Sequence, residues 1–381
     1  MAVKIIVSSE ELKQTLEYIS LIAGASPGKK DDGLKNLSNS VKITAISPCC
    51  NKNYMLIFEC VGNNEQLLYR MEGKSYEDTE KAEITVELRK LASLAKSFDG
   101  DVELNFDINE LIISAGGGLF KLPAQVIPFP NLKPPEGTEK IVLNVSFLQE
   151  AVRYCTVATA VKDNGRAVLC CMQINLKADG SAICFATNTH KLAKFVATKT
   201  GSRTDRTFLL LPINIQHIVD ICDENEITII PNDKFFFAQT PRLEYLCYIV
   251  DGNFLDCENV FQKIKPVKRI VASKRKLLTA IYRASIMTGD ENDQRIKFAS
   301  DNKNMMIESI SVNGSGLDCI PLDRTDGKDD QGYNVSAFNI SRLISNIPSD
   351  SVEISTQGHN LKPILIKEPN SDSGYILAPM R

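Results

Sequence analysis

The chain has 381 residues, of which 43% are hydrophobic and 24% charged, and this composition predicts a globular protein with two or three separate cores. Its apolar runs fall short of the roughly 20 residues that span a bilayer, and its first residues lack a signal-peptide core, so we expect a cytoplasmic protein without a membrane segment. The net charge of −3 excludes a protein that grips nucleic acid over its whole surface, although it leaves room for a local basic face.

The cysteine and histidine residues indicate neither a metal centre nor a cofactor. The eleven cysteines are scattered without a C-x-x-C motif, and most lie in strand-like runs, which is typical of buried thiols in a reducing compartment. The three histidines, His190, His217 and His359, lack metal-ligand spacing. We therefore expect no bound metal and no cofactor.

One sequence pattern occurs three times, beginning at Lys4, Lys140 and Arg269. Each copy reads as a β-branched strand, then Ser or Asn, then a helix with apolar residues at i, i+4 and i+7. The copies begin 136 and then 129 residues apart, close to a third of the chain, which indicates a triplicated domain. The three apolar stripes are Leu12/Leu16/Ile19, Leu148/Val152/Cys155 and Leu277/Ile281/Ala284.

A second pattern recurs inside each repeat and completes the predicted architecture. It begins at Ala82, Thr207 and Gly332, and each copy reads as strand, short helix, acidic turn and strand. The predicted fold class is therefore α+β, with two strand-helix-strand units in each of three domains, at residues 1–132, 133–262 and 263–381. A linker at Pro128–Glu139, which holds four of the 16 prolines, separates the first two domains.

Three loops resemble ligand sites only superficially. The glycine run Gly116–Gly118 is followed by no helix, which favours a hairpin over a phosphate cradle. The segment beginning at Gly24 has the wrong spacing for a Walker loop and is interpreted as a mobile basic loop. The acidic stretch Asp323–Gly332 lacks the ligand spacing of an EF-hand, so we expect a solvated hairpin turn.

Repeated domains of this kind can pair their sheet edges and close into a ring, with the helices along one wall. The helix faces opposite the apolar stripes then become candidates for binding DNA phosphates weakly and without sequence preference. We assign to these faces Arg89, Lys90, Arg153, Arg275, Tyr282 and Arg342, and the fourth helix offers His217 and Asp220. On any single helix, an ordinary solvated face would explain the same residues.

Six fragments in the right order make the chain resemble the bacterial β sliding clamps, the processivity subunits of DNA polymerase III. The most specific are FATNTHKLA from Phe185, DGNFLDCENV from Asp251 and the final YILAPMR. They are similar to the family's ATDGHRLA, DGRFPDYRRV and YVVMPMRL. FKLPAQVIPFPNL, RASIMTGDEND and AFNISRLISNI support them.

The resemblance implies a divergent member that forms a head-to-tail homodimeric ring around double-stranded DNA in the bacterial cytoplasm, at the nucleoid. It also implies a pocket beside the chain end that binds short motifs of the replicative DNA polymerase, the clamp loader and other clamp-binding-motif proteins. Matched residue by residue, this partner-peptide pocket comprises Leu169, Thr187, Thr189, His190, Lys191, Leu192, Leu255, Asn259, Val260, Ile376, Ala378, Pro379 and Met380.

The chain departs from the family pattern inside this pocket. Leu255 stands for a proline, Asn259 for an arginine, Thr189 for a glycine and Ala378 for a methionine. Because Ala378 is smaller and Thr189 larger than the family's residues, we expect the preferred partner peptides to differ.

The resemblance also implies a dimer interface, in which Phe120 and Leu122 meet Ile286 and Met287 of the next copy. From the sequence alone, these four residues fit the cores of their own domains equally well. The family's members are accessory subunits without a catalytic site, so we expect no enzyme.

Two alternatives remain open at this point. One is a clamp-like scaffold that binds partner peptides without encircling DNA. The other is a hydrolase that uses His190 with Cys171 or Cys184, although no acid or oxyanion element stands beside them in the sequence.

Overall fold

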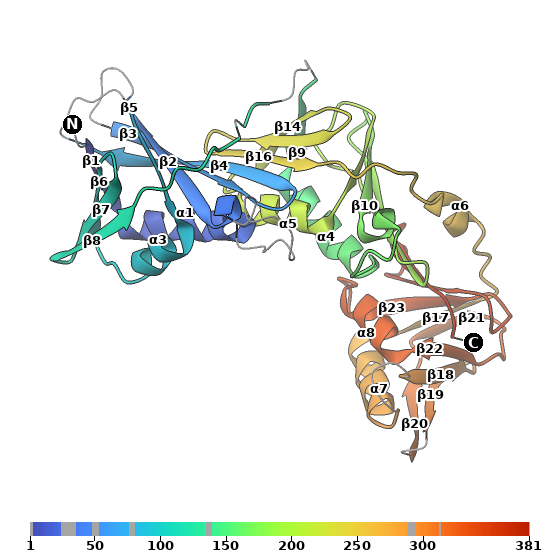
Figure 1. Ribbon diagram of the computed structural model, residues 1–381. Helices are drawn as coiled ribbons and strands as arrows, with labels where there is room; N and C mark the ends of the chain where they lie inside the picture. Colours follow the sequence, from blue (N-terminus) through green and yellow to red (C-terminus); the bar gives the residue numbers. More distant parts are fainter. Residues whose placement is uncertain are drawn as a thin grey trace. The chain divides into compact units, whose positions relative to one another are not determined.

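The computed structural model describes residues 3–23, 36–47, 53–75, 81–130, 132–134, 139–288, 294–311 and 314–380 (Figure 1). The basic loop predicted at Gly24 and part of the linker Pro128–Glu139 lie outside these residues. Within the described ranges, no helix is both long enough and apolar enough to cross a membrane. The chain forms two compact units, and unit 1 comprises Met1–Val145 and Ile213–Ile249, whereas unit 2 comprises Ser146–Pro212 and Val250–Arg381.

Unit 1 is built on one antiparallel sheet of twelve strands, with α1 and α3 side by side on one face (Figure 1). Its main path runs β8-β7-β6-β1-β4-β16-β15-β14-β9, and a branch leaves β4 in the order β3-β2-β5. The elements are β1 (Val3–Ser8), α1 (Ser9–Ala23), β2 (Ser40–Ile46), β3 (Asn53–Val61), β4 (Glu65–Lys74), β5 (Lys81–Glu87), α3 (Leu88–Ala95), β6 (Asp101–Phe106), β7 (Glu110–Ala115), β8 (Gly118–Pro123), β9 (Ile141–Asn144), α5 (Pro212–Ile221), β14 (Glu226–Pro231), β15 (Phe235–Gln239) and β16 (Leu243–Tyr248).

Unit 2 contains a nine-stranded antiparallel sheet, ordered β13-β10-β11-β12-β25-β24-β23-β17-β21, and a four-stranded sheet, ordered β20-β19-β18-β22. Helices α7 and α8 pack against each other. The elements are α4 (Val145–Thr156), the 3-10 helix η1 (Ala167–Cys170), β10 (Met172–Leu176), β11 (Ala182–Thr187), β12 (Lys191–Ala197), β13 (Arg206–Leu210), α6 (Cys257–Gln262), β17 (Lys268–Ser273), α7 (Lys274–Ile286), β18 (Arg295–Ser300), β19 (Asn304–Ser311), β20 (Gly314–Pro321), β21 (Arg324–Gly327), β22 (Tyr333–Ser336), α8 (Ala337–Ser345), β23 (Ser351–Thr356), β24 (Ile364–Lys367) and β25 (Gly374–Leu377).

The predicted α+β fold with repeated strand-helix-strand units is confirmed. Each of α1, α3, α4, α5, α7 and α8 follows one strand and precedes another along the chain. All nine residues of the three predicted apolar stripes are buried, because a helix joined directly to a strand must turn one face onto the sheet. The structure divides into two compact units, and the division of the chain into three domains stays a prediction.

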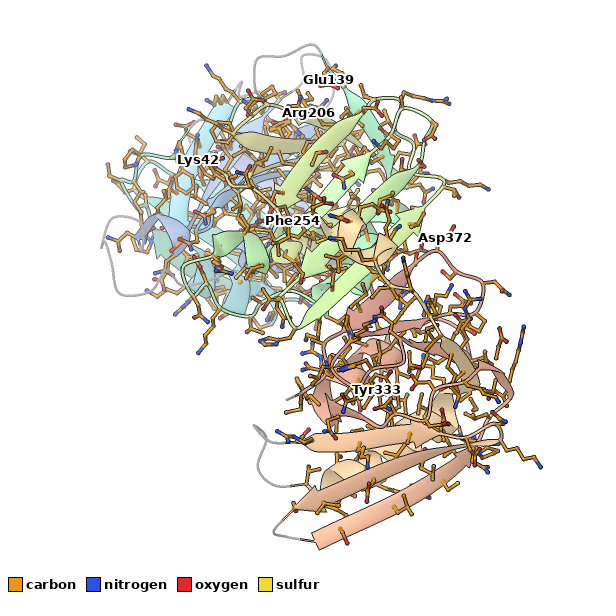
Figure 2. The ribbon with its side chains drawn as sticks, turned by 90° about the vertical axis from the view of Figure 1, so that its right-hand side faces the viewer. Lys42, Glu139, Arg206, Phe254, Tyr333 and Asp372 are labelled. Carbon is orange, nitrogen blue, oxygen red and sulfur yellow. The ribbon has the colours of Figure 1, made fainter. Side chains whose placement is uncertain are left out.

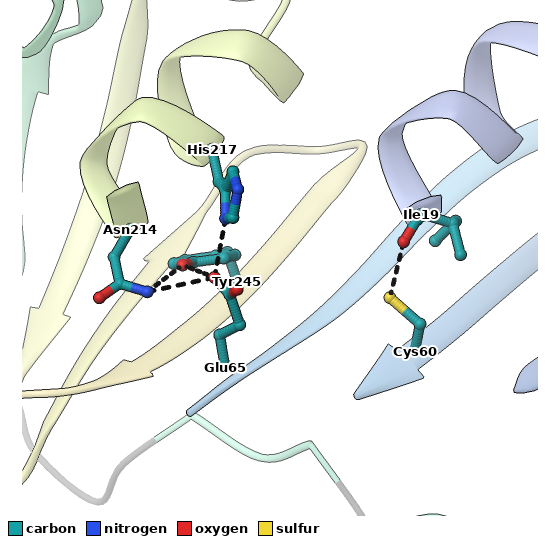
Figure 3. A network of polar contacts seen from close by, with 6 residues as sticks. All are labelled: Ile19, Cys60, Glu65, Asn214, His217 and Tyr245. Atoms are coloured by element: carbon teal, nitrogen blue, oxygen red, sulfur yellow. Dashed lines mark hydrogen bonds and ion pairs between the residues drawn. The ribbon is translucent and has the colours of Figure 1, made fainter. Parts of the chain in front are cut away.

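A buried polar network joins β4 to α5 and β16 within unit 1 (Figure 3). Glu65 Oε2 lies 2.9 Å from His217 Nδ1, accepts a hydrogen bond from Asn214 Nδ2 at 3.1 Å and accepts another from the Tyr245 hydroxyl. His217 is 6% exposed, so its prediction on a free helix face was wrong. His217 can be buried because the carboxylate of Glu65, 152 residues earlier in the chain, replaces the hydrogen bond that the imidazole would make with water.

Two of the loop interpretations can be compared with the structure. Gly116 and Gly117 form the β7–β8 hairpin turn with φ of 56° and 81°, as the hairpin prediction required. The prediction of a solvated turn at Asp323–Gly332 was wrong in part, because β21 pairs with β17 and Asp329 is buried. Tyr333, which is 1% exposed and labelled in Figure 2, donates a hydrogen bond to Asp329 Oδ2 at 2.7 Å.

Candidate functional site

His190 is exposed on the turn between β11 and β12, and side-chain hydrogen bonds hold the backbone of this turn. Asn188 Oδ1 accepts hydrogen bonds from the backbone N–H groups of His190 at 3.1 Å and Lys191 at 2.9 Å. The Thr187 hydroxyl accepts from Thr189 N at 3.0 Å and donates to Lys191 O at 2.7 Å. These side chains replace the backbone pairing that a tight turn lacks.

The end of the chain is held against this turn. β25 lies between β12 and β24, and beyond it Ala378 N donates to His190 O at 2.9 Å. Met380 N donates to Asn334 O at 2.8 Å, so β22 fixes the other end of the short tail. Ala378, Pro379 and Met380 are each half-buried, which leaves part of their apolar surface open to a ligand.

A cavity of about 1150 Å³ opens at this tail. It brings together four residues of the predicted pocket, and seven further lining residues come from other segments of unit 2. The four predicted residues are His190, Ala378, Pro379 and Met380, and the seven missed residues are Gln294, Ser336, Phe338, Asn339, Leu361, Pro363 and Leu377. Mixed apolar and polar walls of this kind suit a short peptide with one apolar and one amide-bearing side chain.

Leu192 and Ile376 lie on the opposite face of the β12–β25 pair. The register pairs Leu192 with Ile376 and Lys191 with Leu377, and side chains alternate between the faces of a sheet. Leu192 and Ile376 belong to an apolar cluster with Phe185 and Cys257. Phe254, labelled in Figure 2, packs against that cluster together with Phe261, Ile264, Ile183 and Leu365.

The remaining predicted pocket residues are distributed around these two features. Leu255 is 49% and Val260 41% exposed, and Asn259 is exposed on α6, where its N–H is capped by Asp256 Oδ1 at 3.1 Å. Leu169 is half-buried in η1, and Thr187 is buried under the turn. Lys191 is 5% exposed, and burial together with the nearby charge of Arg342 lowers the pKa of its ammonium.

The residues predicted to face DNA are all exposed, but their surroundings differ. On α3, Arg89 is exposed beside Lys90, which is paired with Glu87 at 2.8 Å. Arg153 on α4 donates to Asn346 O at 3.2 Å. Arg275 and Tyr282 extend from α7, and the guanidinium of Arg342 on α8 lies 5.4 Å from the centre of the Phe338 ring.

The four residues predicted for the dimer interface divide by burial. Leu122 is 5% exposed within its own unit, and Phe120 is half-buried, with its ring 5.5 Å from that of Phe98. Ile286 is 62% exposed at the end of α7, and Met287 is half-buried, with its carbonyl bonded by the Ser311 hydroxyl at 2.6 Å. An interface at these positions would therefore use Ile286 most directly.

The side chains of the alternative hydrolase do not form a nucleophile-base pair. Cys171 and Cys184 are buried, and burial raises the pKa of each thiol, so that both remain protonated near neutral pH. His190 lies on the exposed turn. Across the described ranges, no three His, Cys, Asp or Glu side chains gather closely enough to hold a metal ion.

Known proteins resemble the chain in both sequence and fold, although no family profile matches it. The beta sliding clamp of Pseudomonas aeruginosa is 25% identical over 316 residues, which cover 79% of this chain and 83% of that protein. The beta sliding clamp of Pseudomonas putida is 24% identical over 317 residues, with 80% and 83% covered.

Among solved structures, the DNA polymerase sliding clamp of Bacillus subtilis matches with a TM-score of 0.86 at 17% identity, covering 100% of both chains. The DNA polymerase III beta subunit of Thermotoga maritima matches with a TM-score of 0.84 at 20% identity, also over 100% of both chains. These two structures establish the fold, and the Pseudomonas proteins establish the sequence relationship. Together, these comparisons show that the chain is similar in sequence to beta sliding clamps and shares the sliding-clamp fold over its full length.

Proposed function

We propose that the chain is a sliding clamp, two copies of which close head to tail around duplex DNA and tether the replicative polymerase. The observation that carries this proposal is the 25% identity to a beta sliding clamp over 79% of the chain, joined to a shared fold over its full length. A closed ring raises the local concentration of polymerase at the primer end by topology, and this role needs no catalytic site. The protein acts in this proposal as an accessory subunit and not as an enzyme.

The proposed contact with DNA is electrostatic and independent of sequence. Arg89, Arg275 and Arg342 are exposed cations on helices, and sparse cations of this kind attract phosphates weakly enough for the ring to slide. The net charge of −3 on the whole chain limits binding elsewhere on its surface.

The decisive experiment measures topological retention. The protein is loaded onto a nicked circular duplex with its cognate clamp loader, and the DNA is then isolated by gel filtration before and after linearisation. A clamp stays with the circle and slides off the linear product. If the protein leaves circular and linear DNA at the same rate, it does not encircle DNA, and the scaffold that binds peptides alone becomes the better description.

We also propose that the cavity at the chain end takes the partner peptide, while the apolar cluster around Leu192 and Ile376 packs on the opposite face of the strand pair. The mixed walls at His190 and Met380 support this assignment. Ala378 and Thr189, which differ from the family pattern, lie at or beside the cavity, so they are proposed to set which motif binds.

This assignment is tested by fluorescence anisotropy with a labelled peptide that carries a glutamine and ends in Leu-Phe. Leu361, which lines the cavity and is 57% exposed, is replaced by Asp, and Ile108, which is 89% exposed on unit 1, is replaced by Asp as the matched control. We expect Leu361→Asp to abolish saturable binding and Ile108→Asp to leave it unchanged. Equal binding by both variants would show that the peptide binds elsewhere.

A further inference from the structure

A second groove in unit 2 runs between α7 and α8 and exposes two aromatic rings. It has a volume of about 330 Å³. Tyr282 of α7 is 66% exposed and Phe338 of α8 is 53% exposed. The other lining residues are Leu278, Ser285, Gln294, Ala337, Ser341, Arg342 and Ser345, and none of these described residues carries a carboxylate. Exposed aromatic rings that share one groove are surfaces on which a flat ligand can stack.

The two helices that form this groove are basic, although the chain as a whole is acidic. The α7 sequence contains Lys274, Arg275, Lys276 and Arg283, α8 contains Arg342, and neither helix contains Asp or Glu. Arg283 is paired with Asp318 at 3.1 Å. Among the described residues, Arg342 has no carboxylate partner, so its charge remains available to an anion.

Arg342 links the aromatic and the basic features. Its guanidinium lies 5.4 Å from the centre of the Phe338 ring. The pKa of the buried Lys191 ammonium is lowered mainly by burial and also by the nearby charge of Arg342. Arg342 therefore lies beside Phe338 and close enough to Lys191 for the two positive charges to repel each other. A phosphate in the groove would relieve the repulsion between them.

We propose that the α7–α8 groove binds unpaired nucleotides of single-stranded DNA, with bases stacked on Tyr282 and on the Phe338–Arg342 pair and the phosphate facing Arg342. A duplex covers the faces of its bases, so the two rings become useful only when a base is unstacked. Arg275 lies on the same helix face as Tyr282, seven residues earlier, and extends the basic track. The inference rests on the proposed function only in naming DNA as the ligand.

Phe338 also lines the cavity at the chain end, so one aromatic ring forms part of both sites. A nucleotide stacked on this ring would restrict it, and a peptide in the cavity would contact the same side chain. The proposal therefore includes coupling, in which single-stranded DNA and a partner peptide alter each other's affinity.

The test uses the full-length protein and fluorescence anisotropy of a labelled oligothymidylate of about 10 nucleotides at low salt, beside a duplex of the same length. The variants are Tyr282→Ala, Phe338→Ala and Arg342→Gln. Two matched controls are Tyr248→Ala, an aromatic residue 51% exposed in unit 1, and Lys276→Gln, an exposed cation of α7 that does not line the groove. All five substituted side chains are solvent-exposed, and thermal unfolding checks that each variant folds.

We expect Tyr282→Ala and Phe338→Ala to weaken single-strand binding by about five- to a hundredfold, while duplex binding and both controls change less than about twofold. Arg342→Gln should weaken binding and reduce its salt dependence. The proposal is overturned if wild type does not bind the oligonucleotide saturably, if Tyr248→Ala weakens it as much, or if the aromatic variants lose single-strand and duplex binding equally.

Failure of this inference can be told apart from failure of the clamp proposal. Oligonucleotide binding needs no closed ring, and retention on nicked circles needs no unpaired base, so each assay can fail while the other succeeds. If Phe338→Ala abolishes peptide binding but leaves single-strand binding intact, the groove belongs to the peptide site and the inference is wrong.

Discussion

Thr189 has a backbone conformation that its own side chain disfavours. Its φ is 74°, in the left-handed region that a β-branched residue rarely adopts. Because glycine adopts this region without steric cost, we expect Thr189→Gly to raise the free energy of unfolding by about 1 kcal/mol, measured by urea denaturation. The strain lies beside His190, so the same variant should also change the affinity for partner peptides.

Asn370 is the matched control for this prediction. Its φ of 63° is also left-handed, but asparagine tolerates that region, so Asn370→Gly should change stability by a few tenths of a kcal/mol at most. A loss of stability in Thr189→Gly would mean that the threonine side chain contributes more than its backbone strain costs.

The lowered pKa of the Asp329 carboxyl predicts how the stability of unit 2 depends on pH. Burial opposes its ionisation, but hydrogen bonds from Thr356, Tyr333, Gln331 and Gly358 together lower the pKa of this carboxyl. A carboxyl whose pKa is lower in the folded state contributes stability above its unfolded pKa of about 3.9 and loses that contribution as the pH falls through the folded value.

We therefore expect wild type to lose stability below about pH 4, and Asp329→Asn to be less stable at neutral pH with a shallower acid dependence. Urea denaturation at a series of pH values measures both effects. Asp326→Asn, at an exposed position on β21, serves as the control. Parallel acid profiles for wild type and Asp329→Asn would contradict the assignment.

Residue by residue, the sequence predicted buried apolar stripes better than buried polar groups. Helical periodicity places Leu12, Leu148 and Leu277 in a core because apolar side chains need no specific partner. His217 and Asp329 are buried only because partners reach them from elsewhere in the fold, which periodicity does not report. Phe338 was missed although it carries a signal, since it is an aromatic residue outside the buried stripe of α8.

At the scale of elements, one side chain joins β25 to α4, in addition to the pairing of β25 with β12 and β24. The Tyr375 ring stacks on Tyr154 of α4, with centroids 4.4 Å apart and planes 9° apart. Its hydroxyl accepts a hydrogen bond from Asn346 Nδ2 at 2.6 Å and donates one to Tyr154 O at 3.1 Å. β25 carries the tail that lines the cavity, so this contact supports the proposed peptide site.

We expect Tyr375→Phe, which loses only the hydroxyl, to lower the free energy of unfolding by about 1 kcal/mol, and Tyr375→Ala to lower it by about 3–5 kcal/mol. Peptide affinity should fall in Tyr375→Ala even where the protein remains folded, because the tail is no longer positioned. Urea denaturation and peptide anisotropy separate the two effects. Unchanged peptide affinity in a folded Tyr375→Ala would show that the tail does not need this anchor.

The order of elements was predictable, whereas their assembly into a site was not. Strand and helix each have a local period, so the strand-helix-strand units could be identified from the sequence. The pairing of Leu192 with Ile376 joins strands 184 residues apart and has no local signature. The cavity gathers segments around His190, Phe338, Leu361 and Met380, so only the resemblance to a family pointed to part of it.

At the scale of the whole molecule, two sheet edges carry exposed apolar side chains. β8 ends the main path of the unit 1 sheet and β20 ends the four-stranded sheet. Leu119 on β8 is 63% exposed and Leu317 on β20 is 70% exposed. An unpaired strand edge with apolar side chains is a template for another strand, so we propose that β8 of one copy meets β20 of the next and closes the dimer.

Ile286 provides the sharpest test of this dimer because it is 62% exposed at the end of α7, which packs on β20. A charge placed in an apolar seam loses its water without gaining a partner, so we expect Ile286→Asp to shift the protein from dimer to monomer in sedimentation equilibrium while its urea midpoint stays unchanged. Ile108→Asp, at an 89% exposed position outside the proposed seam, should remain dimeric. Leu122→Ala should instead destabilise the chain itself by about 2–5 kcal/mol, because Leu122 is 5% exposed within its own unit. If Ile286→Asp and Ile108→Asp sediment alike, Ile286 lies outside the dimer contact and the ring must close through other residues.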